Sequence, residues 1–243
     1  MNRLDIVGFG PGSFEGMTLE AKNSIEKCDC VVGFSTYIKL LQKYFPDKNY
    51  VQTGMGSEVE RTNEALKLAD KGNYVCLVCS GDSQVYGMAG LAYELVKNFE
   101  SVDIHTVPGV TAALSGSAIL GAAAGNDICL ISLSDYHTEW TDIEKRLRAC
   151  AQCDFVIALY NPRSRKRPDG LAKACDILMD VLPENRICGV AENIGRDGQN
   201  AKIMALSELR DYEANMFTTV FIGNSKTIDI NGKMVTPRGY EIE

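Results

Sequence analysis

Residues 74–92, with the sequence YVCLVCSGDSQVYGMAGLA, decide the fold of this chain. Their first part, Tyr74–Cys79, is a continuous apolar run that is too short for an ordinary helix and has a glycine-containing dipeptide on each side. Such a run predicts a parallel strand that is buried on both faces. Ligands of open α/β sheets bind beyond the carboxyl ends of the strands, and Asp82 falls at that place. The loop that starts at Ser80 is therefore predicted to face a ligand.

A second interpretation of this loop stays open. Gly81 and Gly87 would let the backbone approach a ligand closely, but glycine is equally common in a plain turn between a strand and a helix. In such a turn Asp82 or Ser83 would cap the following helix. The loop alone favours neither interpretation.

The composition excludes several classes of protein. The chain has 243 residues, of which 45% are hydrophobic, and 25 basic against 32 acidic residues give a net charge of −7. No apolar run approaches the roughly 18 residues that a membrane span needs. The polar start, MNRLDIVGFG, is unlike a signal peptide, so we expect a cytoplasmic protein. The acidic balance argues against a nucleic-acid-binding surface.

Apolar runs and amphipathic segments alternate along the chain, which predicts an α/β fold. The first half predicts a mainly parallel sheet, with strands at 4–7, 30–33, 74–79 and 102–107. The second half predicts a mixed sheet, because it adds closely spaced strands and a strong hairpin signal at Asn231-Gly232. A run of small uncharged residues, 115–125, suggests a boundary between an N-terminal domain, 1–120, and a C-terminal domain, 121–243.

Local signals predict where two helices begin. Two pairs of residues have the spacing of capping boxes, in which the two side chains bond reciprocally to the backbone of the first turn. The pairs are Ser57 with Glu60 and Thr141 with Glu144.

The glycine-rich segment at 8–12, GFGPG, is a poor match to a dinucleotide-binding turn. Pro11 lacks an amide donor, and the next helix begins only near Thr18, so no helix N-terminus is at hand for a pyrophosphate. We expect no nicotinamide cofactor.

Nine cysteines invite a metal or redox interpretation, which their positions oppose. Cys76 and Cys79 lie three residues apart within one predicted strand, so their side chains point to opposite faces. Cys150 lies on the apolar stripe of a predicted helix, where free cysteine is a common core residue. We therefore predict reduced, buried thiols and no metal site.

Several motifs follow one another along the chain, among them SGD, VPGVTAA, SLSDYHTEW, YNPRSRKR, AENIGR and TPRGY. In these motifs, and in their order, the chain resembles the tetrapyrrole methylase family over nearly its whole length. The resemblance is greatest to its branch that methylates carbon 17 of precorrin-3B or cobalt-factor III in cobalamin (vitamin B12) biosynthesis. It implies two α/β domains with S-adenosylmethionine in the cleft between them, and a homodimer. Carried over by residue, the cofactor contacts fall on Pro11, Ser80, Gly81, Asp82, Val85, Thr111, Ala112, Asn161 and Ile194.

The resemblance also implies what the other polar residues do. Methyl transfer from a sulfonium needs positioning and no dedicated nucleophile. The macrocycle carries many carboxylates, so we expect the basic cluster Arg163, Arg165, Lys166 and Arg167, with Arg238, to bind substrate. Ring contraction needs proton transfers, for which the candidates are Asp135, His137 and Thr138, beside Tyr136. His105, within a predicted strand, is expected to be structural.

Three other functions remain possible at this level. Another methylase of the corrin pathway would share the cofactor loop and differ elsewhere. A ribosomal-RNA methyltransferase of the same superfamily is disfavoured by the negative charge. A non-catalytic small-molecule binding protein would keep the ligand site without turnover. The sequence leaves open whether the substrate is cobalt-loaded or metal-free.

Overall fold

The computed structural model describes residues 2–164 and 168–241. The chain forms two compact units, of which the first ends at Thr111 and the second starts at Ala112. The division lies earlier than the expected boundary near residue 120, because helix α5 (Ala112–Leu120) packs into the core of the second unit. Its residues Ala113 and Leu120 contact Phe221 and Met234 there.

The first unit contains a five-stranded sheet in the order β3-β2-β4-β1-β5, and every pairing is parallel. From β1 the chain passes across β4 to β2, and from β4 it passes across β1 to β5. The two connections therefore leave in opposite directions, and the carboxyl ends of β1 and β4 form a topological switch point. The strands are β1 (Arg3–Gly8), β2 (Cys30–Phe34), β3 (Asn49–Thr53), β4 (Tyr74–Cys79) and β5 (Asp103–Val107).

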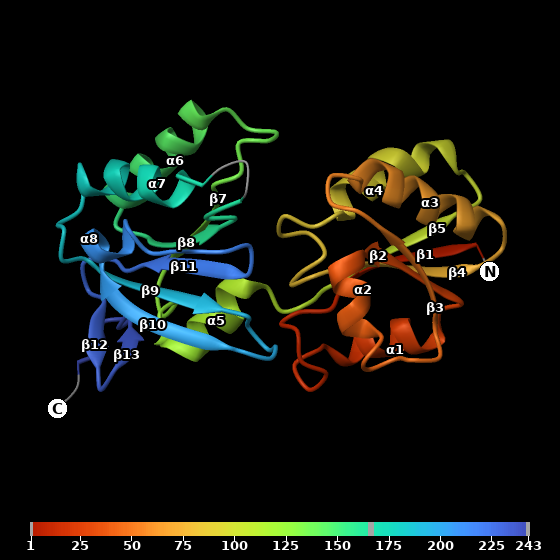
Figure 1. Cartoon of the computed structure of the whole chain (residues 1–243), viewed down its shortest axis with the longest axis horizontal. Coiled ribbons are helices and arrows are strands. Elements are labelled where there is room, and N and C mark those ends of the chain that lie inside the picture. Colours follow the sequence, from red (N-terminus) through yellow and green to blue (C-terminus); the bar gives the residue numbers. More distant parts are fainter. Residues whose placement is uncertain (1, 165–167, 242–243) are drawn as a thin grey trace. The chain divides into compact units, whose positions relative to one another are not determined.

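Helices cover both faces of this sheet (Figure 1). Helices α1 and α2 lie on one face and α3 and α4 on the other, and the short η1 follows α4. Along β4, Cys76 and Val78 pack toward α1 and α2, whereas Leu77 and Cys79 pack toward α3 and α4. The prediction of a strand buried on both faces is confirmed. The helices are α1 (Leu19–Lys27), α2 (Ser35–Leu41), α3 (Glu58–Asp70), α4 (Ala89–Leu95) and η1 (Val96–Asn98).

Both predicted capping boxes are wrong. Ser57 precedes α3 but makes no side-chain capping bond, and its backbone (φ −106°, ψ 35°) is not in the extended conformation that a capping residue normally adopts. Helix α6 (Trp140–Gln152) begins before Thr141, which therefore lies inside its first turn. Thr18 does cap α1, since its Oγ1 accepts a bond of 3.1 Å from Ala21 N.

The second unit contains a mixed sheet in the order β10-β9-β11-β8-β7. Strands β7 and β8 are parallel, whereas β11 is antiparallel to β8 and β9, and β10 is antiparallel to β9. The prediction of a parallel first sheet and a mixed second one is confirmed. The strands are β7 (Ile128–Ser132), β8 (Val156–Tyr160), β9 (Ile187–Glu192), β10 (Asn200–Ala205) and β11 (Thr218–Ile222).

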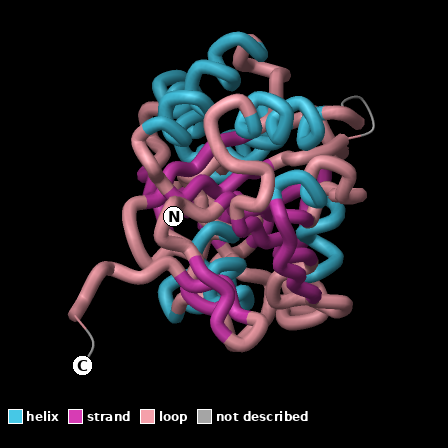
Figure 2. Tube along the Cα trace, turned by 90° about the vertical axis from the view of Figure 1, so that its left-hand side faces the viewer, coloured by secondary structure: helices cyan, strands magenta, loops and turns pink. Residues whose placement is uncertain are grey.

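Helices α6, α7 (Gly170–Met179) and α8 (Leu206–Leu209) pack on one face of this sheet, and α5 packs on the other. The strands form an inner layer with helices on both sides (Figure 2). A small sheet of β12 (Ile228–Ile230), β13 (Lys233–Val235) and β6 (Gly121–Ala122) adjoins α5. The hairpin prediction is confirmed, since Asn231 and Gly232 have φ of 53° and 75°.

No helix in the described part of the chain is long and apolar enough to cross a membrane.

Candidate functional site

Three loops of the first unit pack backbone against backbone at the carboxyl edge of its sheet. They follow β1, β4 and β5. Gly10 N donates to Gly81 O at 2.8 Å, and Cβ atoms added at Gly10 and Gly109 would lie only 2.2 Å from Val110 O and Gly81 O, respectively. Any side chain at these two positions would force the loops apart. Gly10 and Gly109 are therefore required by the close packing of the loops themselves.

Asp82 ties the loop after β4 to the loop after β5. Its Oδ1 accepts bonds from Gln84 N at 2.8 Å and Val85 N at 3.1 Å, and its Oδ2 accepts one from Gly109 N at 3.1 Å. Burial disfavours the carboxylate, but the backbone N–H bonds outweigh burial and lower the pKa of Asp82. A charged brace therefore fixes the shape of the predicted cofactor loop.

Ser83 fixes the same loop by a hydrogen bond to the end of β5. Its side chain is fully buried, and Oγ donates to Val107 O at 3.0 Å. Helix α4 begins only at Ala89, so the interpretation of Asp82 or Ser83 as its N-cap is wrong. Sequence reasoning considered Ser83 only as a helix cap and missed this role, for which the sequence signal is a small hydroxyl residue next to Asp82.

The structure gathers six of the predicted cofactor contacts on these loops of the first unit. Thr111 is buried at the end of the loop after β5. The remaining five lie half-buried or buried on the loops after β1 and β4: Pro11, Ser80, Gly81, Asp82 and Val85.

The other three predicted contacts lie in the second unit. Asn161 follows β8 with a positive φ of 54°, and its Nδ2 donates to Ser132 Oγ at 2.9 Å, at the end of β7. The Tyr160 hydroxyl accepts a bond of 2.8 Å from Ala113 N, which fixes the start of α5 at Ala112. Ile194 packs with α5 in the core, so only its backbone is available to a ligand.

The candidate proton-transfer residues lie on the loop between β7 and α6. Asp135 and His137 are exposed and Thr138 is half-buried. The ring of Tyr136 packs edge-on against His137, with 4.5 Å between centroids. Within the described part of the chain, the His137 ring makes no hydrogen bond to another side chain. The loop thus presents Asp135 and His137 to solvent.

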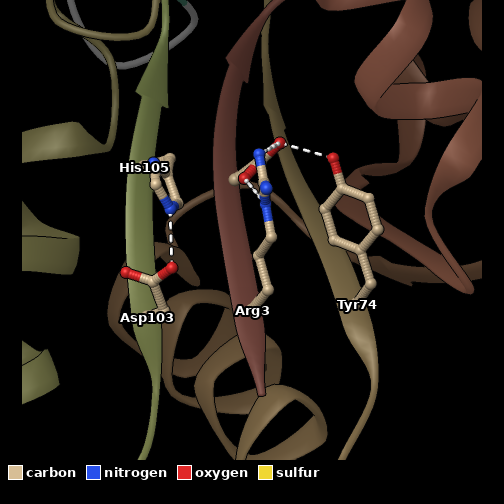
Figure 3. Close-up of polar contacts among 5 residues, drawn as sticks. Arg3, Tyr74, Asp103 and His105 are labelled. Atoms are coloured by element: carbon tan, nitrogen blue, oxygen red, sulfur yellow. Dashed lines mark hydrogen bonds and ion pairs between the residues drawn. The ribbon is translucent and has the colours of Figure 1, made fainter. Parts of the chain in front are cut away.

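His105 is paired with Asp103, as Figure 3 shows. Its Nε2 lies 2.7 Å from Asp103 Oδ2, and both residues belong to β5. Both side chains are largely exposed, and the structural role of His105 stays a prediction.

A buried carboxylate, Asp5, occupies the neighbouring strand β1 and accepts bonds from Arg3 Nε at 2.8 Å and Tyr74 Oη at 2.6 Å (Figure 3). Burial and then the bond to Asp5 raise the pKa of Tyr74 well above its usual value. Arg3 and Tyr74 begin their strands, so this network lies toward the amino edge of the sheet, away from the glycine loops, as we call the three loops that follow β1, β4 and β5.

The predicted substrate-binding residues are only partly described. Arg163 is half-buried after β8, and Arg238 is exposed on the loop after β13. Arg165, Lys166 and Arg167 lie outside the described residues.

The cysteines are free thiols, and the described residues contain no group of three or more histidine, cysteine or acidic side chains that could hold a metal ion. Cys76 and Cys79 belong to opposite faces of the first sheet, as predicted. Burial raises the pKa of Cys79 to about 11 and that of Cys175 to about 12, so both stay protonated at neutral pH.

Comparison with known proteins relates this arrangement to a family. Residues 3–210 match the family model of tetrapyrrole (corrin/porphyrin) methylases. The chain is 41% identical over 240 residues to the probable cobalt-factor III C(17)-methyltransferase of Salmonella typhimurium, covering 98% of this chain and 100% of that protein. It is 40% identical over 244 residues to the cobalt-factor III methyltransferase of Priestia megaterium, but spans only 45% of that longer protein.

The crystal structure of the methyltransferase CobJ superposes with a TM-score of 0.89 at 31% identity, covering 96% of this chain and 99% of that one. The glycine loops, the Asp82 brace and the two α/β units thus occur in a chain whose sequence matches one family from β1 into the second unit. The chain belongs to the tetrapyrrole methylase family.

Proposed function

We propose that this chain transfers a methyl group from S-adenosylmethionine to carbon 17 of a precorrin-3-level tetrapyrrole, with ring contraction, in cobalamin biosynthesis. The observation that supports the proposal is the set of three loops after β1, β4 and β5, which Asp82 braces at the carboxyl edge of the first sheet. These loops occur in a chain that matches, over almost its full length, a protein named as a probable cobalt-factor III C(17)-methyltransferase. We also propose that it works as a homodimer, as the family resemblance implies, and that it is located in the cytoplasm.

The loop edge fits the cofactor chemically. S-adenosylmethionine has no phosphate, so its site needs backbone polar groups and a few hydroxyls in place of a phosphate cradle. The glycine loops offer backbone atoms without covering side chains, and Ser80 and Thr111 add hydroxyls. The Asp82 carboxylate accepts three bonds from backbone N–H groups, so its main role would be to fix the shape of the loop. We propose contacts from Pro11, Ser80, Gly81, Val85 and Thr111, and from Ala112, Asn161 and Ile194 of the second unit.

When bound, S-adenosylmethionine supplies an electrophilic methyl group. The chain then has to hold the nucleophilic ring carbon in line with it, and positioning of this kind is worth up to roughly 7–11 kcal/mol. Rigid loops suit that task, because a displacement of about 1 Å costs roughly a hundredfold in rate. Asp135, His137 and Thr138 are our candidates for proton transfer during ring contraction, since Asp135 and His137 are exposed and Thr138 is half-buried.

The substrate's carboxylates suit the arginines that follow β8. Arg163 is placed there by the end of the strand, and Arg165 and Arg167 are its neighbours in the sequence. Guanidinium groups bind carboxylates in bidentate fashion. The two relatives described above are named for cobalt-factor III, so we propose the cobalt-loaded macrocycle as substrate, with metal-free precorrin-3B as the alternative.

The experiment is a turnover assay of the purified chain with S-adenosylmethionine and each macrocycle in separate reactions, followed by absorption and mass. We expect cobalt-factor III to gain one methyl group. Methylation of a different corrin precursor alone would leave the family assignment standing and overturn the branch. Binding of both ligands without turnover would favour a non-catalytic binding protein.

A further inference from the structure

Arg61 is a buried arginine whose charge is poorly compensated. It lies on α3, and only 3% of its surface is exposed. Buried arginines are ordinarily paired with a carboxylate, since an isolated charge is costly to remove from water. Among the described residues, no carboxylate lies within ion-pair distance of Arg61. The acidic residues Glu58 and Glu60 of the same helix are exposed and make no bond to it.

The bonds that Arg61 does make are few. Nε donates to Thr53 Oγ1 at 2.7 Å and Nη2 donates to Gly54 O at 2.7 Å. Within the described part of the chain, Nη1 is paired only with the thioether sulfur of Met88, at 3.5 Å. A thioether is a weak acceptor, and a guanidinium has five N–H groups to satisfy. The Nη1 side of the group therefore lacks a strong partner.

This guanidinium lies at the same sheet edge as the glycine loops. Thr53 ends β3, and Phe34, whose ring centroid is 5.9 Å from Arg61 Cζ, ends β2. Met88 belongs to the loop that begins after β4 and contains Asp82. Cys79 is the last residue of β4. Burial raises the pKa of its thiol, and the positive charge of Arg61 lowers that pKa by a smaller amount. All of these contacts are within the first unit.

We propose that Arg61 binds a carboxylate group of the ligand through Nη1, in place of the Met88 sulfur. Met88 is unbranched and flexible, so it can move aside without rearrangement of the backbone. The adjoining segment offers an approach, because a Cβ added at Gly54 or Gly56 would meet nothing within 4 Å. A carboxylate there would supply both the missing charge and a strong acceptor.

The proposal rests on the proposed function, which offers two sources of this carboxylate. One is the methionine carboxylate of S-adenosylmethionine, and the other is a side chain of the tetrapyrrole. Both have the same chemistry, and separate binding measurements distinguish them. A purely structural arginine would affect neither ligand selectively.

The experiment measures the affinity of Arg61→Met for S-adenosylmethionine and for cobalt-factor III by calorimetry. We expect a loss of at least tenfold for one ligand and little change for the other, with partial recovery in Arg61→Lys, which keeps the charge. Arg148→Met is the matched control, since Arg148 lies on the surface and pairs with Glu144 and Asp180. Unchanged affinity for both ligands in Arg61→Met overturns the proposal, and so does an equal loss for both.

A second measurement uses the wild-type chain and so does not depend on how the variant folds. Methionine methyl groups are labelled with carbon-13, and the Met88 resonance is assigned from Met88→Leu. We expect the Met88 resonance to shift when the ligand that binds Arg61 is added. A resonance that neither ligand shifts contradicts the displacement of Met88 from Arg61. If the wild-type chain binds neither ligand, the proposed function fails together with this inference. If both ligands bind but Met88 stays in place, only the inference fails.

Discussion

The carboxylate of Asp82 accepts a 3.1 Å hydrogen bond from the backbone N–H of Gly109, and this bond joins two loops that follow strands not adjacent in the sheet. Strand β1 lies between β4 and β5, so the bond crosses over its carboxyl end. The loop from Ser80 to Val85 is thereby held in one shape before any ligand arrives. Preorganisation of this kind reduces the entropy that binding has to overcome.

Asp82→Ala is expected to weaken S-adenosylmethionine binding at least tenfold, about 1.4 kcal/mol. The variant removes the acceptor of three backbone N–H groups, which frees the loop and leaves those donors without their partner. Calorimetry on the two proteins measures the difference. Asp103→Ala is the control, because Asp103 is exposed on β5 and pairs with His105. Equal affinity in Asp82→Ala and the wild type would remove the brace from the account of the site.

The brace should also give stability a specific dependence on pH. The folded-state pKa of Asp82 is lowered, so its contribution is complete above the ordinary aspartate pKa of about 3.9 and disappears as the pH falls through the lowered value. Urea unfolding of the wild type and Asp82→Asn at a series of acidic pH values tests this. The wild type's advantage should shrink as the pH drops below about 4. An advantage that grows in acid would contradict the assignment.

Gly109→Ala is expected to destabilise the first unit by several kcal/mol, because its Cβ would lie 2.2 Å from Gly81 O and 2.4 Å from Gly8 O. Both contacts are with backbone, which cannot rotate away. Gly90→Ala is the matched control: Gly90 lies in α4 with nothing within 4 Å of an added Cβ, so alanine should stabilise by about 0.5–1 kcal/mol. Thermal unfolding compares the pair. Similar melting temperatures for both variants would show that the loops are not packed as described.

The thiols should differ sharply in reactivity. Cys153 is exposed, whereas Cys76, Cys175 and Cys188 are buried and burial raises the pKa of each of these three. Since the thiolate is the reactive form, a thiol reagent at neutral pH should label Cys153 quickly and the three buried cysteines only after unfolding. Peptide mass mapping before and after denaturation reads this out. Rapid labelling of Cys188 in the native protein would be incompatible with the described core.

The sequence allowed the strands to be predicted well where an apolar run ends in glycine or a small polar residue. Strand β4 has the predicted bounds, Tyr74–Cys79, because burial on both faces leaves no ambiguity of period. The hairpin at Asn231-Gly232 was equally clear, since both residues tolerate positive φ. The capping boxes failed because their motif specifies only side chains. A cap also needs an extended backbone, which Ser57 lacks, and a place just before the helix, whereas Thr141 lies inside α6.

The site could be predicted only in part. The loop around Asp82 was located from its place after a strand, but its bond to Gly109 depends on strand order, which the sequence does not reveal. Arg61 was missed for the same reason, since Thr53, Gly54 and Met88 meet it only in the folded chain. One signal was present: Arg61 precedes Ala65 by four residues and so lies on the apolar stripe of α3.

The most direct test of the central claim is the position of the transferred methyl group. The purified chain is incubated with cobalt-factor III and S-adenosylmethionine carrying a carbon-13 methyl, and the product is examined by mass spectrometry and carbon-13 NMR. The account predicts one labelled methyl group on carbon 17 of a ring-contracted macrocycle. A label on any other carbon, or no transfer to cobalt-factor III or precorrin-3B, would contradict it.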